Sequence, residues 1–453
     1  MSDRQTKKSR ATLFDQRGIP PLGQAFPMAL QHVVAMIVGC VTPAIIVSNV
    51  AGLSQPDRVM LIQASLIIAA ICTLIQNFPI GRQGGFRLGS GLPMILGVSF
   101  AYVPSLQAIA ALPDGLAAIA GSMIVGGIVA ILVGIFIKRI RRLFPALITG
   151  TVVFTIGLSL YPTAINYMAG GVGSPMFGAW QNWLVALFTL GVVVTLSHFT
   201  KGIAKLASIL LGMVAGYILA ACMGMVNFSS VGQAGAFALP LPLHFGIRFD
   251  LASCIAMGLL FAINSIQAIG DFTATTVGGL GREPTDDELE SGIVCYGATN
   301  LISAFFCGLP TATYSQNVGI VSTTKVVNRT VMALASAIIL LAGLFPKFSA
   351  ILTTIPQCVL GGATITVFSS IAMTGIKLIT REKMDARNTA IVGLSVALGV
   401  GISQVPTALA QFPESFTMIF GKSPVVLTTL VALLLNQILP REAKNDVIKS
   451  DIK

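Results

Sequence analysis

Long apolar runs recur along this chain, and they constrain its fold more than any other feature. Runs of about 18 to 25 mostly hydrophobic residues follow one another from Ala25 to Leu439, and each could cross a hydrocarbon core about 30 Å thick as a helix. Only 10% of the residues are charged, whereas soluble domains contain about 25%. The sequence therefore predicts an all-α integral membrane protein that crosses a lipid bilayer many times.

Fourteen transmembrane segments are expected. They lie near residues 26–49, 58–78, 90–112, 115–137, 143–167, 180–199, 203–226, 251–277, 290–308, 313–325, 329–345, 356–378, 388–406 and 423–440. The residues before the first segment are basic and polar, with no apolar stretch ahead of a small-residue cleavage site. They do not resemble a cleavable signal peptide, so the first segment is expected to direct insertion.

The basic residues, which give the chain a formal net charge of +11, are distributed unevenly between the loops. If both termini lie on one side, that side carries all but four of the 28 Lys and Arg residues, the exceptions being Arg58, Arg248, Lys347 and Lys422. Cytoplasmic loops carry such an excess. The charge therefore predicts both termini in the cytoplasm and no nucleic-acid partner, and the expected location is the cell inner membrane.

A short repeat suggests that the chain has two related halves. Residues 145–150 are PALITG and residues 356–361 are PQCVLG, each with Pro and Gly five positions apart at the start of an apolar segment. If the fifth and twelfth segments correspond, the chain is two halves of seven, and an odd number inverts the second half. Inverted repeats are typical of secondary transporters; a chance coincidence is the alternative.

Two of the expected segments would make poor helices. The third, RLGSGLPMILGVSFAYVPSL, contains three glycines and two prolines, and the tenth, CGLPTATYSQNVGIVSTTK, is short, polar and β-branched. Non-helical backbone survives at membrane depth only where protein or an aqueous cavity satisfies it, and interrupted segments in both halves indicate a binding site. We expect the tenth segment to line a cavity, with Ser99 of the third segment opposite.

Asp271 is the one carboxylate deep within an apolar segment, and Asn264 and Gln267 share its helical face. Ionisable groups in such positions are costly and usually functional, which favours a proton or cation site; a structural carboxylate bonded to hydroxyl groups is the alternative. His32 is the one histidine within a segment. It either bonds to another helix or takes part in substrate contact or proton relay.

The polar groups of the tenth segment suit a flat heterocycle. The amides of Gln316 and Asn317 both donate and accept, Gly319 permits close approach of the backbone, and Phe100 or Tyr314 could stack on a ring. An amide ladder that supports a broken helix is the alternative. The sequence shows no metal-ligand cluster, nucleophile elbow, phosphate-binding loop or paired carboxylates, so we expect neither an enzyme nor a bound cofactor or metal.

Five stretches, in the order of the segments, resemble the nucleobase–ascorbate transporter family, also called the nucleobase:cation symporter-2 group. QNVGIVSTTK in the tenth segment fits the family signature in full: an amide or acid, then Asn-x-Gly, then Thr and a basic residue. The other four are LQH, GSGLPMILGVSFAYV, AIGDFTATT and IPQCVLGGA in the first, third, eighth and twelfth segments. The resemblance covers about residues 25–440.

This resemblance implies a fold of fourteen spans in two inverted halves, with short strands in spans 3 and 10 and substrate between them. It implies a core domain of spans 1–4 and 8–11 and a gate domain of spans 5–7 and 12–14, through which members usually dimerise. The corresponding ranges are 25–137 and 251–346 for the core, 138–250 and 347–440 for the gate, and 1–24 and 441–453 for cytoplasmic tails.

The resemblance also implies roles for single residues. Gln316 and Asn317 match substrate-binding and motif positions, Asp271 matches the coupling Asp, His32 the first-span His, and Ser99 a position associated with purine selectivity. The amide at 316 favours the purine branch, which includes xanthine and uric acid permeases.

Two positions depart from the pattern of the family. Gln267 stands where a substrate-binding Glu is usual, and Tyr296 stands where purine members usually have Asp. An amide at 267 suits a ligand that offers one donor and one acceptor there, or the urate anion that a Glu would repel.

The expected function is therefore uptake of a purine nucleobase such as xanthine or uric acid, coupled to protons. Alternatives within transport are another nucleobase (guanine, hypoxanthine or uracil), sodium coupling, and anion exchange on a related fold. An anion exchanger would need a basic residue or paired helix N-termini at the middle of the membrane.

Overall fold

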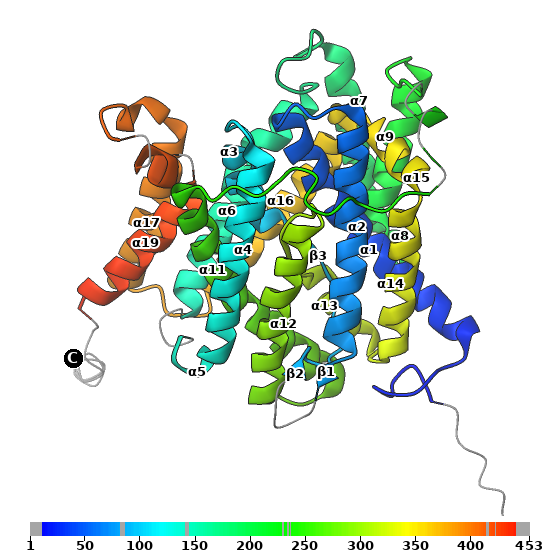
Figure 1. Ribbon diagram of the computed structural model, residues 1–453, viewed down its shortest axis with the longest axis horizontal. Coiled ribbons are helices and arrows are strands. Elements are labelled where there is room, and N and C mark those ends of the chain that lie inside the picture. Colours follow the sequence, from blue (N-terminus) through cyan, green and yellow to red (C-terminus); the bar gives the residue numbers. More distant parts are fainter. Residues whose placement is uncertain are drawn as a thin grey trace, which may run out of the picture.

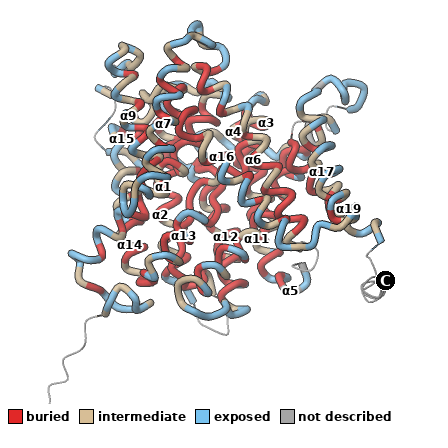
Figure 2. The backbone as a smooth tube through the Cα atoms, turned by 180° about the vertical axis from the view of Figure 1, so that it is seen from behind, coloured by how far each residue is buried: buried red, intermediate tan, exposed pale blue. Residues whose placement is uncertain are grey.

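The computed structural model describes residues 11–81, 87–140, 145–228, 231–232, 235, 237–413, 416–421 and 423–440. The predicted tail at 441–453, and residues 1–10 of the predicted N-terminal tail, lie outside this part of the chain. The described residues are mostly helical, and the long helices run side by side as a bundle (Figure 1). Buried residues concentrate in the middle of this bundle (Figure 2).

The long helices coincide with predicted segments. They are α1 (Leu22–Val50), α2 (Gln55–Asn77), α4 (Gly115–Ile135), α6 (Ala146–Met168), α7 (Trp180–Phe199), α11 (Leu251–Thr275), α12 (Asp286–Phe305), α16 (Gln357–Ile379) and α17 (Ala386–Gln404). Within the described ranges, eight helices are long and apolar enough to cross a membrane, or nine if a bent pair counts as one span. The prediction of a multi-pass membrane protein is confirmed, whereas the count of fourteen stays a prediction.

The other helical elements are shorter. They are η1 (Phe100–Tyr102), α3 (Val103–Ala110), α5 (Ile137–Ile140), α8 (Gly202–Leu206), α9 (Ser208–Cys222), η3 (Thr276–Leu280), α13 (Ser315–Thr324), α14 (Arg329–Leu344), α15 (Pro346–Thr353), η4 (Pro406–Leu409), η5 (Thr417–Gly421) and α19 (Pro424–Ile438). The seventh predicted segment is thus two helices, α8 and α9, rather than one. After α14, which is the eleventh predicted segment, the chain bends by 79° into α15. Pro346 begins this new helix, because proline suits a first helical position.

Two short antiparallel ribbons accompany the helices. One pairs β1 (Ile80–Gly81) with β2 (Arg87–Leu88) at the end of the bundle where α2 ends, and the other pairs β3 (Leu96–Val98) with β4 (Thr311–Thr313) inside it. In the inner ribbon, Gly97 lies opposite Ala312. Short strands therefore occur in the third and tenth segments, as the family resemblance implies.

Side chains satisfy the outer edges of the inner ribbon. The Thr73 hydroxyl of α2 donates to the Leu96 carbonyl and accepts from the Leu96 amide, both at 3.0 Å. On the opposite edge the Asn300 side chain of α12 accepts from the Thr311 amide at 2.8 Å. Extended backbone within a membrane needs such partners, so α2 and α12 make this ribbon possible.

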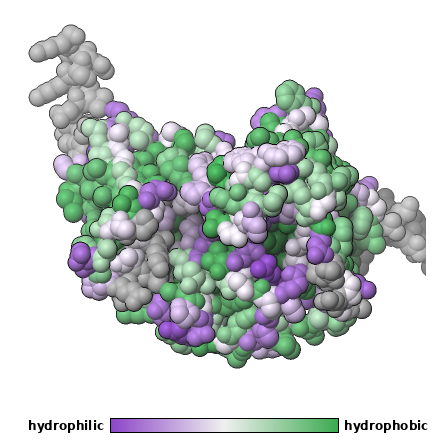
Figure 3. Space-filling view, turned by 90° about the horizontal axis from the view of Figure 1, so that it is seen from above, coloured by the Kyte–Doolittle hydropathy of each residue, from purple (hydrophilic) through white to green (hydrophobic). Residues whose placement is uncertain are grey.

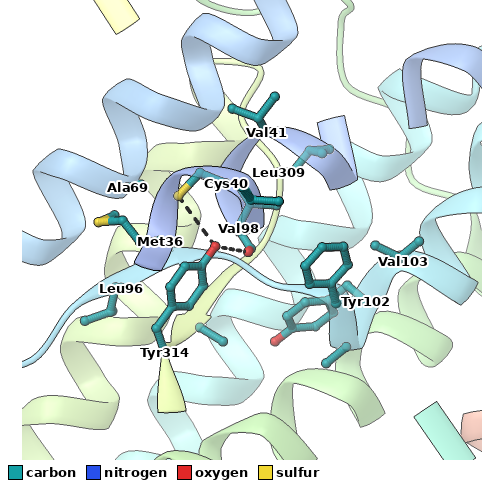
Figure 4. Packing of buried hydrophobic residues seen from close by; sticks show 14 of the residues in the cluster. Met36, Cys40, Val41, Ala69, Leu96, Val98, Tyr102, Val103, Leu309 and Tyr314 are labelled. Carbon is teal, nitrogen blue, oxygen red and sulfur yellow. Dashed lines mark hydrogen bonds between the residues drawn. The ribbon is translucent and has the colours of Figure 1, made fainter. Parts of the chain in front are cut away.

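Tyr314 links the two strands of the inner ribbon. Its hydroxyl donates to the Val98 carbonyl at 2.6 Å and lies 3.5 Å from the Cys40 sulfur, as Figure 4 shows. Tyr314 is buried, so its ring is packed between the ribbon and α1. The tyrosine that the sequence suggested as a stacking platform therefore also holds β3 to β4.

Helices α6 and α16 are antiparallel and approach each other closely along their lengths. Gly150, near the start of α6, lies against the end of α16, and Gly361, near the start of α16, lies against the end of α6. Between them, a Cβ atom added at Gly157 would lie 2.5 Å from the Ala372 amide nitrogen. These are the two helices that carry the short sequence repeat, and their opposite directions are what an inverted repeat requires.

Candidate functional site

A cavity of about 260 Å³ lies between the inner ribbon and the α6–α16 pair. One wall comes from the broken segments and α11 and includes Ser99, Phe100, Gln267 and Gln316. The other wall is largely apolar and comes from α6, α9 and α16. The structure therefore brings together five of the residues that the sequence singled out, Tyr314 included, although Ser99 and Gln316 lie more than 200 positions apart in the chain.

The two amides in this cavity have no competing protein partner. Gln316 is an exposed residue in the first turn of α13, and Gln267 is half-buried on α11. Neither side chain has a hydrogen-bond partner among the described residues, although both line the cavity. Each amide offers one acceptor atom and one two-hydrogen donor, so both donors and both acceptors are available to a ligand.

Two helix N-termini meet at the same cavity. The 3₁₀ turn η1 begins directly after Ser99, whose hydroxyl accepts from the Ala101 amide at 3.2 Å. Helix α13 begins directly after β4, at Ser315. The first amides of a helix lack internal partners and carry partial positive charge, so the cavity favours a carbonyl-rich or anionic ligand.

Asp271 lies behind the cavity wall rather than in it. It is 8% exposed, and its two oxygens accept hydrogen bonds from the Thr313 hydroxyl at 2.5 Å and the Ser315 hydroxyl at 2.9 Å. Thr313 and Ser315 themselves line the cavity. This is the hydroxyl-bonded arrangement that the sequence left as an alternative. The side chains of Thr313 and Ser315 separate the carboxylate from the cavity.

His32 and Asn317 bond to each other outside the cavity lining. The Asn317 amide nitrogen lies 3.0 Å from His32 Nδ1 and 3.1 Å from the His32 carbonyl oxygen. Because a carbonyl can only accept, the NH₂ group must face both atoms, so Nδ1 accepts and the imidazole is neutral with its proton on Nε2. The two residues are 1% and 2% exposed, and they tie α1 to α13.

The remaining predicted residues differ in position. Phe100 lines the cavity and packs edge-to-face on Phe368 of α16, with ring centroids 5.2 Å apart. Gly319 is exposed, and nothing described lies within 4 Å of a Cβ atom placed there. It is not among the lining residues, so close approach of its backbone to a ligand stays a prediction.

The sequence did not single out two polar residues of α16 that line the cavity. Ser370 and Thr374 lie one turn apart on α16 and line the same cavity as the two amides. Thr374 donates to the Ser370 carbonyl at 2.9 Å. The signal available was a pair of hydroxyls at helical spacing in an otherwise apolar segment.

Tyr296, the second position that departs from the family pattern, is not among the residues that line the cavity. It is buried, and its hydroxyl bonds to the hydroxyl of Tyr102 on the segment that follows β3. Its ring also lies 5.7 Å from that of Phe261. The tyrosine therefore takes part in packing between α12, α11 and the third segment.

Comparison with known proteins decides the family. A family model described as a permease family, Xan_ur_permease, matches residues 23–408. The chain belongs to the permease family. This permease is 34% identical over 421 residues to the uric acid permease PucJ of Bacillus subtilis, a match that covers 91% of this chain and 92% of the relative.

Other relatives carry similar names. This permease is 34% identical to a xanthine permease of Bacillus subtilis, with 91% of this chain and 93% of the relative covered. It is 32% identical to the xanthine permease XanP of Escherichia coli, with 93% of both chains covered. The resemblance found in the sequence motifs is confirmed, and this permease is a transporter rather than an enzyme.

Solved structures show the same fold at low sequence identity. The transmembrane domain of the cyanobacterial bicarbonate transporter BicA gives a TM-score of 0.59 at 16% identity, covering 91% of this permease and 97% of that chain. The murine anion transporter Slc26a9 gives a TM-score of 0.58 at 12% identity, covering 91% of this permease and 68% of that chain.

Proposed function

We propose that this permease takes up a purine nucleobase, xanthine or uric acid, by secondary active transport coupled to protons. The observation that carries the proposal is the pair of unpartnered amides, Gln267 and Gln316, on one wall of a cavity of about 260 Å³. An oxopurine edge alternates N–H and C=O groups, which an amide matches with its own acceptor and donor. The names of the relatives support the same substrate class.

In this proposal the amide of Gln267 determines which charge state of the substrate the site accepts. A carboxylate there would repel an anion, whereas an amide accepts with one atom and donates with the other. The N-termini of η1 and α13 add partial positive charge. Together they favour urate or another oxopurine with negative charge on its oxygens over a ligand that presents only donors.

Coupling is assigned to Asp271. A charged carboxylate among apolar helices is costly, and protonation removes that cost when the loaded site moves. The carboxylate bonds to Thr313 and Ser315, the residues on either side of Tyr314. Its protonation therefore changes hydrogen bonds at the cavity wall itself. Sodium at the same group is the alternative, and the proposal involves no bound cofactor.

Anion transport is the second candidate, because one specific observation favours it. The paired helix N-termini that an anion exchanger would need are present at the cavity. Proteins of the same fold include a bicarbonate transporter and an anion transporter. The amides distinguish the two candidates. Two amides that each offer a donor and an acceptor match the edge of a purine better than they match an inorganic ion.

A thermal-shift panel on the purified protein tests the proposal. A ligand stabilises the folded state by RT ln(1 + [L]/Kd), so xanthine or urate should raise the melting temperature of the wild type. Gln316→Ala should lose that shift, whereas Gln404→Ala, at the exposed end of α17, should keep it. Stabilisation by bicarbonate or chloride, with none by purines, would contradict the proposal.

A further inference from the structure

A second and larger cavity, of about 420 Å³, lies at the end of the bundle where α1 ends and α2 begins. We call this end the distal face, because the described N-terminal residues and the β1–β2 ribbon lie at the other end (Figure 1). Figure 3 looks onto the distal face and shows hydrophilic side chains around a hollow. The two cavities share no lining residue.

One positive charge dominates the distal cavity. Arg58 is the sole charged residue among its described lining residues. Its Nε donates to the Leu53 carbonyl at 2.9 Å, and its two terminal nitrogens have no partner among the described residues. The neighbouring Asp57 does not neutralise it at short range, because that carboxylate bonds to Ser54 and His244 and does not line the cavity.

The rest of the lining includes amides and hydroxyl groups that suit a small molecule with both hydrogen-bond donors and acceptors. Gln357, at the start of α16, has a side-chain oxygen that is buried without a hydrogen-bond partner among the described residues. Asn49 and Gln55 also line the cavity, and their amide nitrogens donate to the Tyr167 and Thr353 hydroxyls at 3.2 and 2.6 Å. A guanidinium with free donors binds planar anions well, and the neutral amides can meet the remaining polar groups.

The distal cavity is aligned with the cavity of about 260 Å³ that we propose to hold the purine, and which we call the substrate cavity. Helix α1 lines the substrate cavity at Gly39 and the distal cavity at Asn49, and ten residues of helix span about 15 Å. Helix α16 lines both cavities too, at Gln357 and at Val367, with the same separation. The stretches of α1 and α16 between these lining residues, which we call the α1–α16 seam, therefore lie between the two cavities.

A buried polar group lies on this seam. Thr42 has the helical spacing that places it on the face of α1 that bears Gly39 and Asn49. It is 0% exposed, and its hydroxyl has no partner among the described residues. Buried hydroxyls without a partner are rare and call for an explanation; a polar molecule passing along the seam would provide a transient one.

We propose that the distal cavity is a capture site for anionic purines, in which Arg58 holds the anion before it moves along the α1–α16 seam to Gln267 and Gln316. The inference rests on the proposed function and adds to it the anionic form of the substrate. A capture site raises the local concentration of substrate at the entrance, so its loss should raise KM and leave the maximal rate unchanged.

Initial rates of uptake by intact cells test the inference, with urate, or xanthine at a pH where it is ionised, as the substrate. Arg58→Gln should raise KM about tenfold, as expected when a charge-assisted contact is lost, with an unchanged maximal rate per transporter. Gln357→Glu, which adds a negative charge to the same cavity, should act in the same direction. Arg58→Lys should retain most of the wild-type KM.

Arg248→Gln is the matched control. Arg248 is also a cation of the distal face, but it bonds to the Pro113 carbonyl and does not line the cavity, so its loss should leave KM unchanged. A KM for Arg58→Gln equal to that of the wild type would overturn the capture site. So would an equal rise of KM in Arg58→Gln and Arg248→Gln. A wild type that takes up no purine would instead overturn the proposed function.

Discussion

Gln267 is the residue whose chemistry most affects which purine is taken up. Its amide lines the cavity without a protein partner, so a carboxylate at this position would meet the ligand directly. Gln267→Glu should shift preference away from urate, because two like charges would lie in one site. It should favour neutral xanthine, whose N–H groups a carboxylate accepts. Competition of unlabelled purines against labelled xanthine measures this, and unchanged preference would count against the assignment.

Asp271 should separate binding from accumulation. Asp271→Asn keeps a side chain of similar size beside Thr313 and Ser315 but cannot take up a proton. We expect purine binding to persist in part, and accumulation driven by a pH gradient to be lost. The matched control is Asp250→Asn, because Asp250 caps the start of the same helix and Asn caps nearly as well.

Full accumulation by Asp271→Asn would show that the proton binds elsewhere. If Asp250→Asn lost accumulation to the same extent, the effect would reflect damage to α11 and not to coupling.

The chemistry of single residues was easier to predict than their direction. The sequence grouped Gln316 and Asn317 as one recognition pair, but neighbours in a helix point about 100° apart. The structure accordingly directs Gln316 into the cavity and Asn317 to His32 of α1. Helical periodicity alone shows that the two amides cannot share one face of the helix. Which of them faces the ligand depends on where α1 packs.

At the scale of elements, close packing of α6 against α16 depends on glycine. A Cβ atom at Gly157 would lie 2.5 Å from the Ala372 amide nitrogen, whereas one at Gly191 of α7 would meet nothing within 4 Å. Gly157→Ala should therefore destabilise the fold by about 1–3 kcal/mol through overpacking. Gly191→Ala should cause no loss, since alanine suits a helix better than glycine.

The melting temperature of the two variants in one detergent measures this difference. Equal melting temperatures would show that the two helices can separate at no cost.

Elements with strong patterns were predicted closely, and irregular ones were not. The sequence predicts the sixth segment at 180–199, which is α7, and the eighth at 251–277, where α11 spans Leu251–Thr275. The sequence does not predict the break between α8 and α9, because no proline or glycine marks it, nor the helix α15, which is too short to cross a membrane. The partners of the inner ribbon, Thr73 and Asn300, come from distant helices that no local pattern identifies.

At the scale of the whole molecule, two antiparallel relations support an inverted arrangement. Helices α6 and α16 carry the short repeat and run in opposite directions, and β3 and β4 pair antiparallel at the cavity. The substrate cavity lies between elements of the predicted core and elements of the predicted gate. The division into core and gate and a homodimer through the gate stay predictions, as do fourteen spans with both termini in the cytoplasm.

The central claim is that this permease moves a purine with protons through the cavity lined by Gln267 and Gln316. Uptake of labelled xanthine or urate into proteoliposomes with an imposed proton gradient tests it most directly. We expect accumulation above the external concentration, with no dependence on sodium and with collapse when a protonophore is added. Gln316→Ala should abolish it. Purine movement that ignores the gradient, or movement of bicarbonate or chloride in its place, would contradict the account.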